Sequence, residues 1–198
     1  MKKFVALLLL LGVMTLCSPV AQAGFVDPAQ NPGAQPFTCE FSGSPNQHDW
    51  GFDYSGPTLT MDEVIHSTGL DDVVMSGETD SDPAFTVVKT IENDSGIVWT
   101  EYILSLSGGG GATFVEGTAS AAGNKLQTVD YLHPAAIKFG GANPVAPGEM
   151  LTLSFDINVP TTGLFNFTLT QEPVPEPATM ALLGLGTLPL LRWRRARS

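Results

Sequence analysis

The sequence contains little cysteine. Of its two cysteines, Cys17 lies in an N-terminal segment with the features of a cleaved leader, which leaves Cys39 in the remaining chain. A single thiol cannot form an internal disulfide or a thiolate zinc site. We expect Cys39 to be a small buried hydrophobic residue, which is a common role for a free cysteine.

Positive charge is scarce in residues 24–172, the body of the chain. This body contains no arginine and only Lys89, Lys125 and Lys138, but it holds every acidic residue except Glu176. Binding to nucleic acid without sequence preference depends on Lys and Arg neutralising phosphates, so the composition excludes it. The same negative charge argues against docking on anionic lipid headgroups.

Sequence motifs of common catalytic sites are missing. His48, His66 and His133 do not occur in the H-x-x-E, H-E-x-x-H or H-x-H spacing of a local metal site. There is no G-x-S-x-G nucleophile motif, and the glycine run at 108–111 lacks the Lys-Ser/Thr of a phosphate loop. We expect the protein to have no enzymatic activity.

Residues 1–23 have the pattern of a secretory signal peptide. Two lysines are followed by an uncharged, mostly apolar run (4–16) that is too short to span a bilayer. Small residues then match the A-x-A cleavage pattern, with Ala21 and Ala23 before the cut and Gly24 after it. We therefore expect export through the Sec machinery and a mature chain that begins at Gly24.

Residues 173–198 combine prolines, an apolar run and a basic cluster. Prolines at 173, 175 and 177 keep the chain extended around Glu176, in a form that a processing enzyme can bind. The apolar run 178–191 would measure about 21 Å as a helix, which is short for a hydrocarbon core of ~30 Å. By the positive-inside rule the C-terminus should stay in the cytoplasm, held by Arg192, Arg194, Arg195 and Arg197.

Together, the Pro175-Glu176-Pro177 motif, the Leu/Gly-rich run and the arginines resemble the PEP-CTERM sorting segment of bacterial exported proteins. This resemblance implies transient anchoring in the inner membrane and cleavage near the motif by the membrane protease exosortase. It also implies a destination at the cell surface or in the extracellular matrix. The resemblance covers residues 174–198 and indicates a sorting route, not the activity of the body. A permanent single-pass anchor on a proline stalk is the alternative.

The body reads as an irregular leader (24–36) followed by one domain (37–172). In the domain, short runs of alternating apolar and polar residues are separated by Gly, Pro, Asn, Asp and Ser. This period-two pattern predicts an all-β domain, a single Ig-like or jelly-roll-type antiparallel β-sandwich. The clearest strands cover 150–159 and 164–170.

Three local expectations follow from the turns and spacing. The Asn-Asp-Ser-Gly turn at 93–96 predicts a hairpin over 85–106, and residues 160–163 predict a second hairpin joining the last two strands. Residues 60–66 fit a helix with a capping-box start and fit a strand equally well.

An acidic loop is the best candidate for a metal site. Glu78, Asp80 and Asp82 are spaced two residues apart on an irregular segment, and Ca²⁺ takes six to eight oxygen ligands. The loop lacks the full EF-hand pattern, however, and a solvated acidic surface explains the same residues. Both interpretations stand on the sequence alone.

Trp50, flanked by Asp49 and Asp53, is the candidate for ligand binding. Aromatic rings stack on sugars, and residues 50, 52 and 54 are aromatic at period two. Packing in the core explains this spacing as well, and we favour it.

Together these patterns predict an exported, exosortase-sorted structural protein of the cell surface or of an exopolysaccharide matrix. Its negative charge would keep it soluble and allow cation bridging to acidic polysaccharide. A carbohydrate-binding module, supported by calcium, is the first alternative, and an aromatic row on an outer sheet face would favour it. A glycoside hydrolase on a jelly-roll is the second alternative, and it would need two carboxylates facing each other across a groove.

Overall fold

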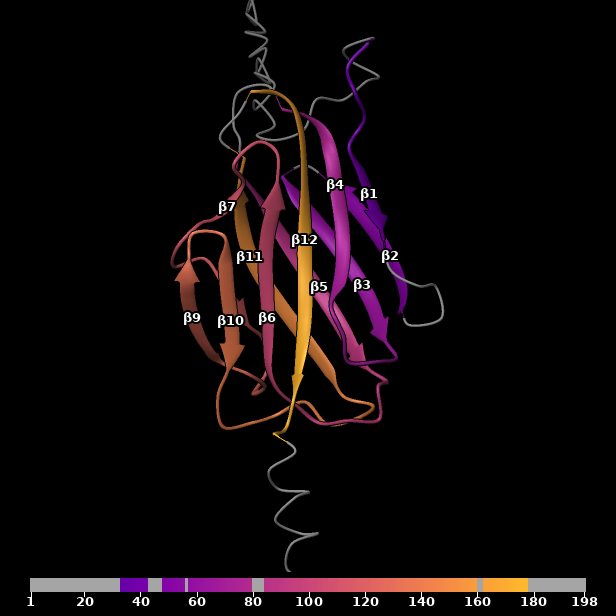
Figure 1. Ribbon diagram of the computed structural model, residues 1–198, viewed down its shortest axis with the longest axis vertical. Helices are drawn as coiled ribbons and strands as arrows, with labels where there is room; N and C mark the ends of the chain where they lie inside the picture. Colours follow the sequence, from indigo (N-terminus) through magenta and orange to yellow (C-terminus); the bar gives the residue numbers. More distant parts are fainter. Residues whose placement is uncertain (1–32, 43–47, 56, 80–83, 160–161, 178–198) are drawn as a thin grey trace, which may run out of the picture.

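The computed structural model describes residues 33–42, 48–55, 57–79, 84–159 and 162–177. These residues form twelve strands in two sheets that pack face to face (Figure 1). The expected all-β sandwich is therefore confirmed. The described chain begins at the top of Figure 1 and ends at the bottom, at opposite ends of the long axis.

Each sheet contains six strands. Sheet A, nearer the viewer in Figure 1, has the order β1 (Thr38–Phe41), β4 (Asp71–Thr79), β12 (Gly163–Pro175), β6 (Trp99–Gly108), β10 (Ala136–Gly140) and β9 (Thr128–His133). Sheet B has the order β2 (His48–Ser55), β3 (Thr58–Ile65), β5 (Ala84–Asn93), β11 (Met150–Asn158) and β7 (Thr113–Phe114), and β8 (Ser120–Ala121) also pairs with β11.

The core lies between the sheets and is built by the alternating residues of each strand. On β11, the side chains of Leu151, Leu153, Phe155 and Ile157 are fully buried, and the residues between them are half-buried. β12 follows the same rule, since its phenylalanines point inward while Leu164 is 69% exposed. The faces predicted from period two are correct for both strands.

Both predicted hairpins are wrong. β5 pairs with β3 and β11 in sheet B, whereas β6 pairs with β12 and β10 in sheet A. β11 and β12 are separated in the same way. The alternation of apolar and polar residues shows which side of a strand faces the core. It does not show whether the turn after the strand leads to a neighbour in the same sheet or to a strand of the other sheet. In this chain both turns connect a strand of sheet B to a strand of sheet A.

One pairing departs from the expected purely antiparallel arrangement. β3 and β5 are parallel, with Met61 opposite Lys89. The chain leaves β3, crosses to β4 in sheet A and crosses back to β5, so two reversals of direction make the two strands of sheet B parallel. Residues 60–66, which fit a helix or a strand, lie mainly in strand β3.

β12 occupies the interior of sheet A, between β4 and β6. It continues to Pro175, three residues beyond the predicted domain end at 172, and so includes the first prolines of the C-terminal segment. Its pairing with β4 stops at Gln171, and beyond that point β12 pairs with β6 alone. The end of the domain and the start of the proline motif therefore share one strand.

A chain of buried polar groups links the two sheets. Lys89 on β5 forms an ion pair with Glu63 on β3, and both side chains are fully buried. Gln171 on β12 donates from Nε2 to Glu63 Oε2 (2.9 Å) and accepts from the Tyr102 hydroxyl on β6 (2.8 Å). Burial raises the pKa of the Tyr102 phenol well above its usual range, so the hydroxyl remains a donor.

Replacing Lys89 with methionine should destabilise the fold strongly. The substitution leaves the Glu63 carboxylate buried without its cation, which costs about 3–5 kcal/mol in comparable sites. Urea unfolding of the purified protein measures the loss.

The double variant Lys89→Met/Glu63→Met should recover a large part of this lost stability, because no charge is then buried. The matched control Lys138→Met removes a lysine from a solvent-accessible ion pair and should cost much less. Equal losses for the two single variants would contradict this account.

Candidate functional site

The proline motif lies at the bottom of the sandwich, where β12 leaves sheet A (Figure 1). Pro173 and Val174 stand opposite Tyr102 and Glu101 of β6, and Pro175 stands opposite Trp99 after a shift of register. The motif therefore begins inside the sheet and not on a separate stalk.

Two hydrogen bonds hold this end of the strand against the start of β6. The Glu176 N–H donates to the carbonyl oxygen of Val98 (3.1 Å), and the Thr100 hydroxyl donates to the carbonyl oxygen of Val174 (3.4 Å). Pro175 is half-buried, whereas Glu176 and Pro177 are exposed. The motif thus presents its carboxylate to solvent while its backbone is still paired.

Comparison with protein families matches residues 173–196 to the PEP-CTERM protein-sorting motif. The chain carries this sorting motif. The PEP-CTERM motif implies an exported protein that exosortase processes and that is sorted to the cell surface, and the resemblance stated from the sequence is confirmed. No curated protein and no solved structure matches the chain.

The rest of the PEP-CTERM segment lies outside the described residues, together with the signal peptide. The expected transmembrane run 178–191, the four arginines and the predicted cleavage site at Gly24 all belong to that part of the chain. Within the described ranges, no helix has the length and apolar character needed to cross a bilayer.

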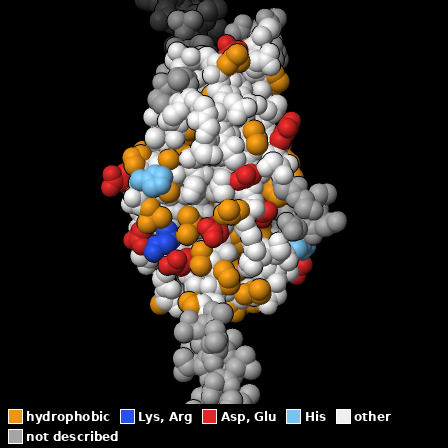
Figure 2. Space-filling view, in the orientation of Figure 1, with side chains coloured by type: hydrophobic (Ala, Val, Ile, Leu, Met, Phe, Trp, Pro, Cys, Tyr) orange, Lys and Arg blue, Asp and Glu red, His pale blue; other side chains and the backbone are white. Residues whose placement is uncertain are grey.

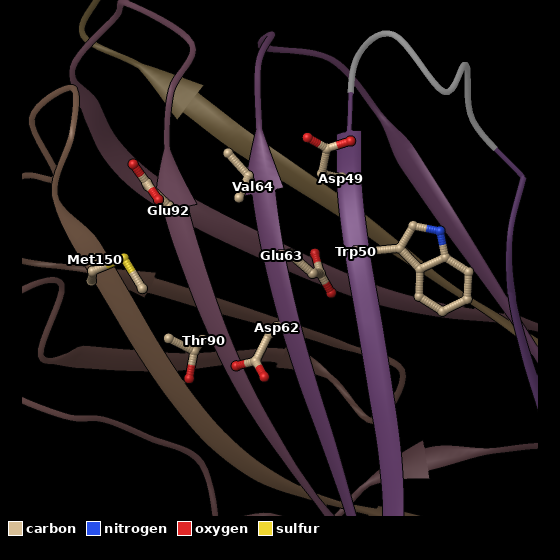
Figure 3. Close-up of a pocket in the computed structure, with 8 residues that line it drawn as sticks. All are labelled: Asp49, Trp50, Asp62, Glu63, Val64, Thr90, Glu92 and Met150. Atoms are coloured by element: carbon tan, nitrogen blue, oxygen red, sulfur yellow. The ribbon is translucent and has the colours of Figure 1, made fainter.

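A second candidate site is an open groove of about 440 Å³ in sheet B. Its lining includes Asp49 on β2, Asp62 and Val64 on β3, Thr90 and Glu92 on β5, and Met150 on β11. These positions share the outer face of the sheet, because Asp49 stands opposite Val64, Asp62 opposite Thr90 and Glu92 opposite Met150 (Figure 3). We call this surface the sheet B groove.

The sheet B groove is acidic because the lysines of the body are engaged elsewhere. Lys89 is buried with Glu63, Lys125 contacts Glu149 in a loop pair, and Lys138 lies on the outer face of sheet A. There Lys138 pairs with two carboxylates, and Figure 2 shows basic atoms on that face among acidic ones. None of the three lysines is among the residues that line the groove.

A histidine, His66, contacts Asp49 of the groove lining. His66 Nε2 lies 3.3 Å from Asp49 Oδ2, and His66 Nδ1 lies 2.8 Å from Asp94 Oδ2. The hydrogen bonds to Asp94 and Asp49 raise the pKa of the His66 imidazole above its usual value. Protonation of His66 therefore strengthens the link between β2, the end of β3 and the turn after β5.

The residues proposed for sugar binding do not share one face. Asp49 and Asp53 point outward, whereas Trp50 stands opposite the buried Glu63 on the inward face. Figure 3 shows both Trp50 and Glu63 among the residues that line the groove. Trp50 stacks on Phe52 with ring centroids 5.7 Å apart, at the edge of the sandwich. Of the other two aromatic residues in this period-two row, Phe52 is 42% exposed and Tyr54 is half-buried. Trp50 is half-buried and packs against the core, and it also contributes to the lining of the sheet B groove.

The calcium hypothesis concerns a loop that is mostly outside the described residues, since Asp80 and Asp82 both lie there. Glu78 is described, and its Oε2 accepts a hydrogen bond from the backbone N–H of Gln35 (3.2 Å). In the ranges that the structure describes, no group of three or more His, Cys, Asp and Glu side chains could hold a metal ion.

Several site residues were missed from the sequence. Asp62, Thr90 and Glu92 alternate with buried residues on their strands, so their outward orientation was readable, but nothing indicated that β3 and β5 are neighbours. The contacts of Val98 and Thr100 with the motif depend on the register between β12 and β6, which leaves no local signal.

The thiol of Cys39 should be unreactive in the folded protein. Its side chain is buried against the core, and burial raises the pKa of the thiol to about 12. Because the thiolate is the nucleophile, we expect no alkylation of native mature protein by iodoacetamide at pH 8 and rapid alkylation in 8 M urea, measured by mass. Alkylation at the same rate in both conditions would show that Cys39 is accessible.

Proposed function

We propose that the protein is a non-catalytic structural component of the cell surface or of an extracellular polysaccharide matrix. We further propose that its tail anchors it transiently in the inner membrane, with the C-terminus in the cytoplasm, until exosortase releases it. The observation that carries the proposal is the sheet B groove, an acidic surface without lysine on a domain that bears a PEP-CTERM motif.

The chemistry of this face suits an extended acidic polymer. Thr152 and Ser154 continue the outer face beyond Asp62, Thr90 and Glu92, so hydroxyls lie among the carboxylates. Carboxylates repel an acidic polysaccharide directly, but a divalent cation can take oxygen ligands from both. Because the body contains three lysines, no arginine and all acidic residues except Glu176, such bridging is the dominant electrostatic route to an anionic polymer.

The sorting step predicts a defined mature mass. Protein recovered from the extracellular fraction of the host should begin at Gly24 and end between Pro175 and Ala178, because the signal peptide and the tail are removed. Intact-mass spectrometry of membrane and extracellular fractions tests this directly. A protein found only in the membrane fraction with Arg192 to Arg197 still present would contradict processing.

The matrix role predicts cation-dependent binding to an acidic polymer. Co-sedimentation of the mature protein with polygalacturonate should require 1 mM Ca²⁺ and disappear with EDTA. The variant Asp62→Asn/Glu92→Gln should bind several-fold more weakly, because it removes two carboxylates from the sheet B groove. The control Glu40→Gln/Glu172→Gln makes the same charge change on the outer face of sheet A and should bind like wild type. Equal weakening by both variants would indicate a general charge effect and argue against the groove.

A further inference from the structure

We propose that residues 172–177 must separate from β6 before exosortase can cleave the chain, so that the folded sheet itself limits the rate of processing. The inference rests on sorting by exosortase, as established by the PEP-CTERM motif. It assigns Val98 and Thr100 of the β6 side as positioning residues that hold the motif until it detaches.

The pairing pattern places a weak point at Gln171. From Phe167 to Gln171, β12 has β4 on one side and β6 on the other, but from Glu172 onward only β6 remains. Two of the next residues are prolines, which have no N–H to donate to the sheet. The last part of the strand therefore has one partner strand where residues 167–171 have two, and its prolines offer fewer N–H donors.

The β6 side of the contact is held firmly. The buried Asn93 donates from Nδ2 to the carbonyl oxygens of Ile97 (2.8 Å) and Val145 (3.0 Å). Trp99 exchanges backbone hydrogen bonds with Val145 and donates from Nε1 to the Ser95 hydroxyl (3.0 Å). Opening should therefore move the end of β12 and leave the start of β6 in place.

Separation should stop at Gln171. This side chain is fully buried and bonds to Glu63 and Tyr102, so moving it would break the polar chain that links the sheets. Local openings of this kind cost less than global unfolding, because Pro173 is the one buried residue among 172–177. The domain can release its last residues and remain folded.

The short distance in sequence between the paired end of β12 and the apolar run explains why the end of β12 must separate from β6. Only Pro177 lies between Glu176, which is bonded to Val98, and the apolar run that starts at Ala178. A membrane protease would have to work against the surface of the folded domain. Releasing 172–176 adds five residues, or up to about 17 Å of extended chain. A protease that binds its substrate as an extended strand also needs the Glu176 N–H that Val98 holds.

A disulfide across the weak point tests the inference. Val174 and Glu101 stand directly opposite each other, and such cross-strand positions are within the reach of a disulfide. The full chain with Val174→Cys/Glu101→Cys, in a Cys39→Ala background, is expressed in the host. Pulse-chase with intact-mass detection should show tail removal slowed about tenfold or more relative to the Cys39→Ala chain.

Two matched variants make the result decisive. Thr168→Cys/Ser107→Cys places a disulfide between the same strands and on the same face, but above Gln171, and should be processed normally. A six-residue Gly/Ser insertion after Val174 in the slowed variant should restore cleavage, because it frees the motif without opening the sheet.

The outcomes separate this inference from the sorting function. Failure to process the Cys39→Ala chain and the wild type would contradict sorting by exosortase itself. Normal processing of the 174–101 disulfide, equal slowing by the 168–107 disulfide, or no rescue by the insertion would each overturn the detachment requirement while sorting stands.

Discussion

The structure depends on one buried charge pair. Lys89 and Glu63 occupy inward positions on parallel strands, and burying either charge alone would cost several kcal/mol. The pair therefore fixes the register of β3 against β5, since a slip of one residue would turn one charge outward and leave the other in the core. Gln171 and Tyr102 extend the same constraint to sheet A, so the pair also determines how the two sheets face each other.

This constraint connects folding with sorting. β12 is the last strand to be synthesised, yet it occupies an interior position of sheet A and supplies Gln171 to the buried polar chain. The sandwich is therefore complete only when the chain has emerged as far as the sorting motif. A body that has not folded lacks the hydrogen bond between Glu176 and Val98, so the pairing of the motif depends on the fold.

Sequence patterns predicted the faces of the strands better than their partners. The burial of Leu151, Phe155 and Phe167 follows from alternation, and the same rule places Lys89 at an inward position. It also separates Asp49 from Trp50, because neighbours on a strand point to opposite faces. The position of β5 beside β3, and of β12 between β4 and β6, arises from contacts between distant segments that no local turn encodes.

The opposite placement of the two ends of the domain has a mechanical consequence. The described chain enters at one end of the long axis and leaves at the other, and β12 runs along that axis (Figure 1). In antiparallel pairs the hydrogen bonds lie perpendicular to the strands. Tension along the axis therefore acts in shear on the hydrogen bonds that join β12 to β4 and to β6, and it acts on all of them at the same time. A sandwich attached to neighbours through its two ends would thus resist stretching along the direction in which the chain transmits force.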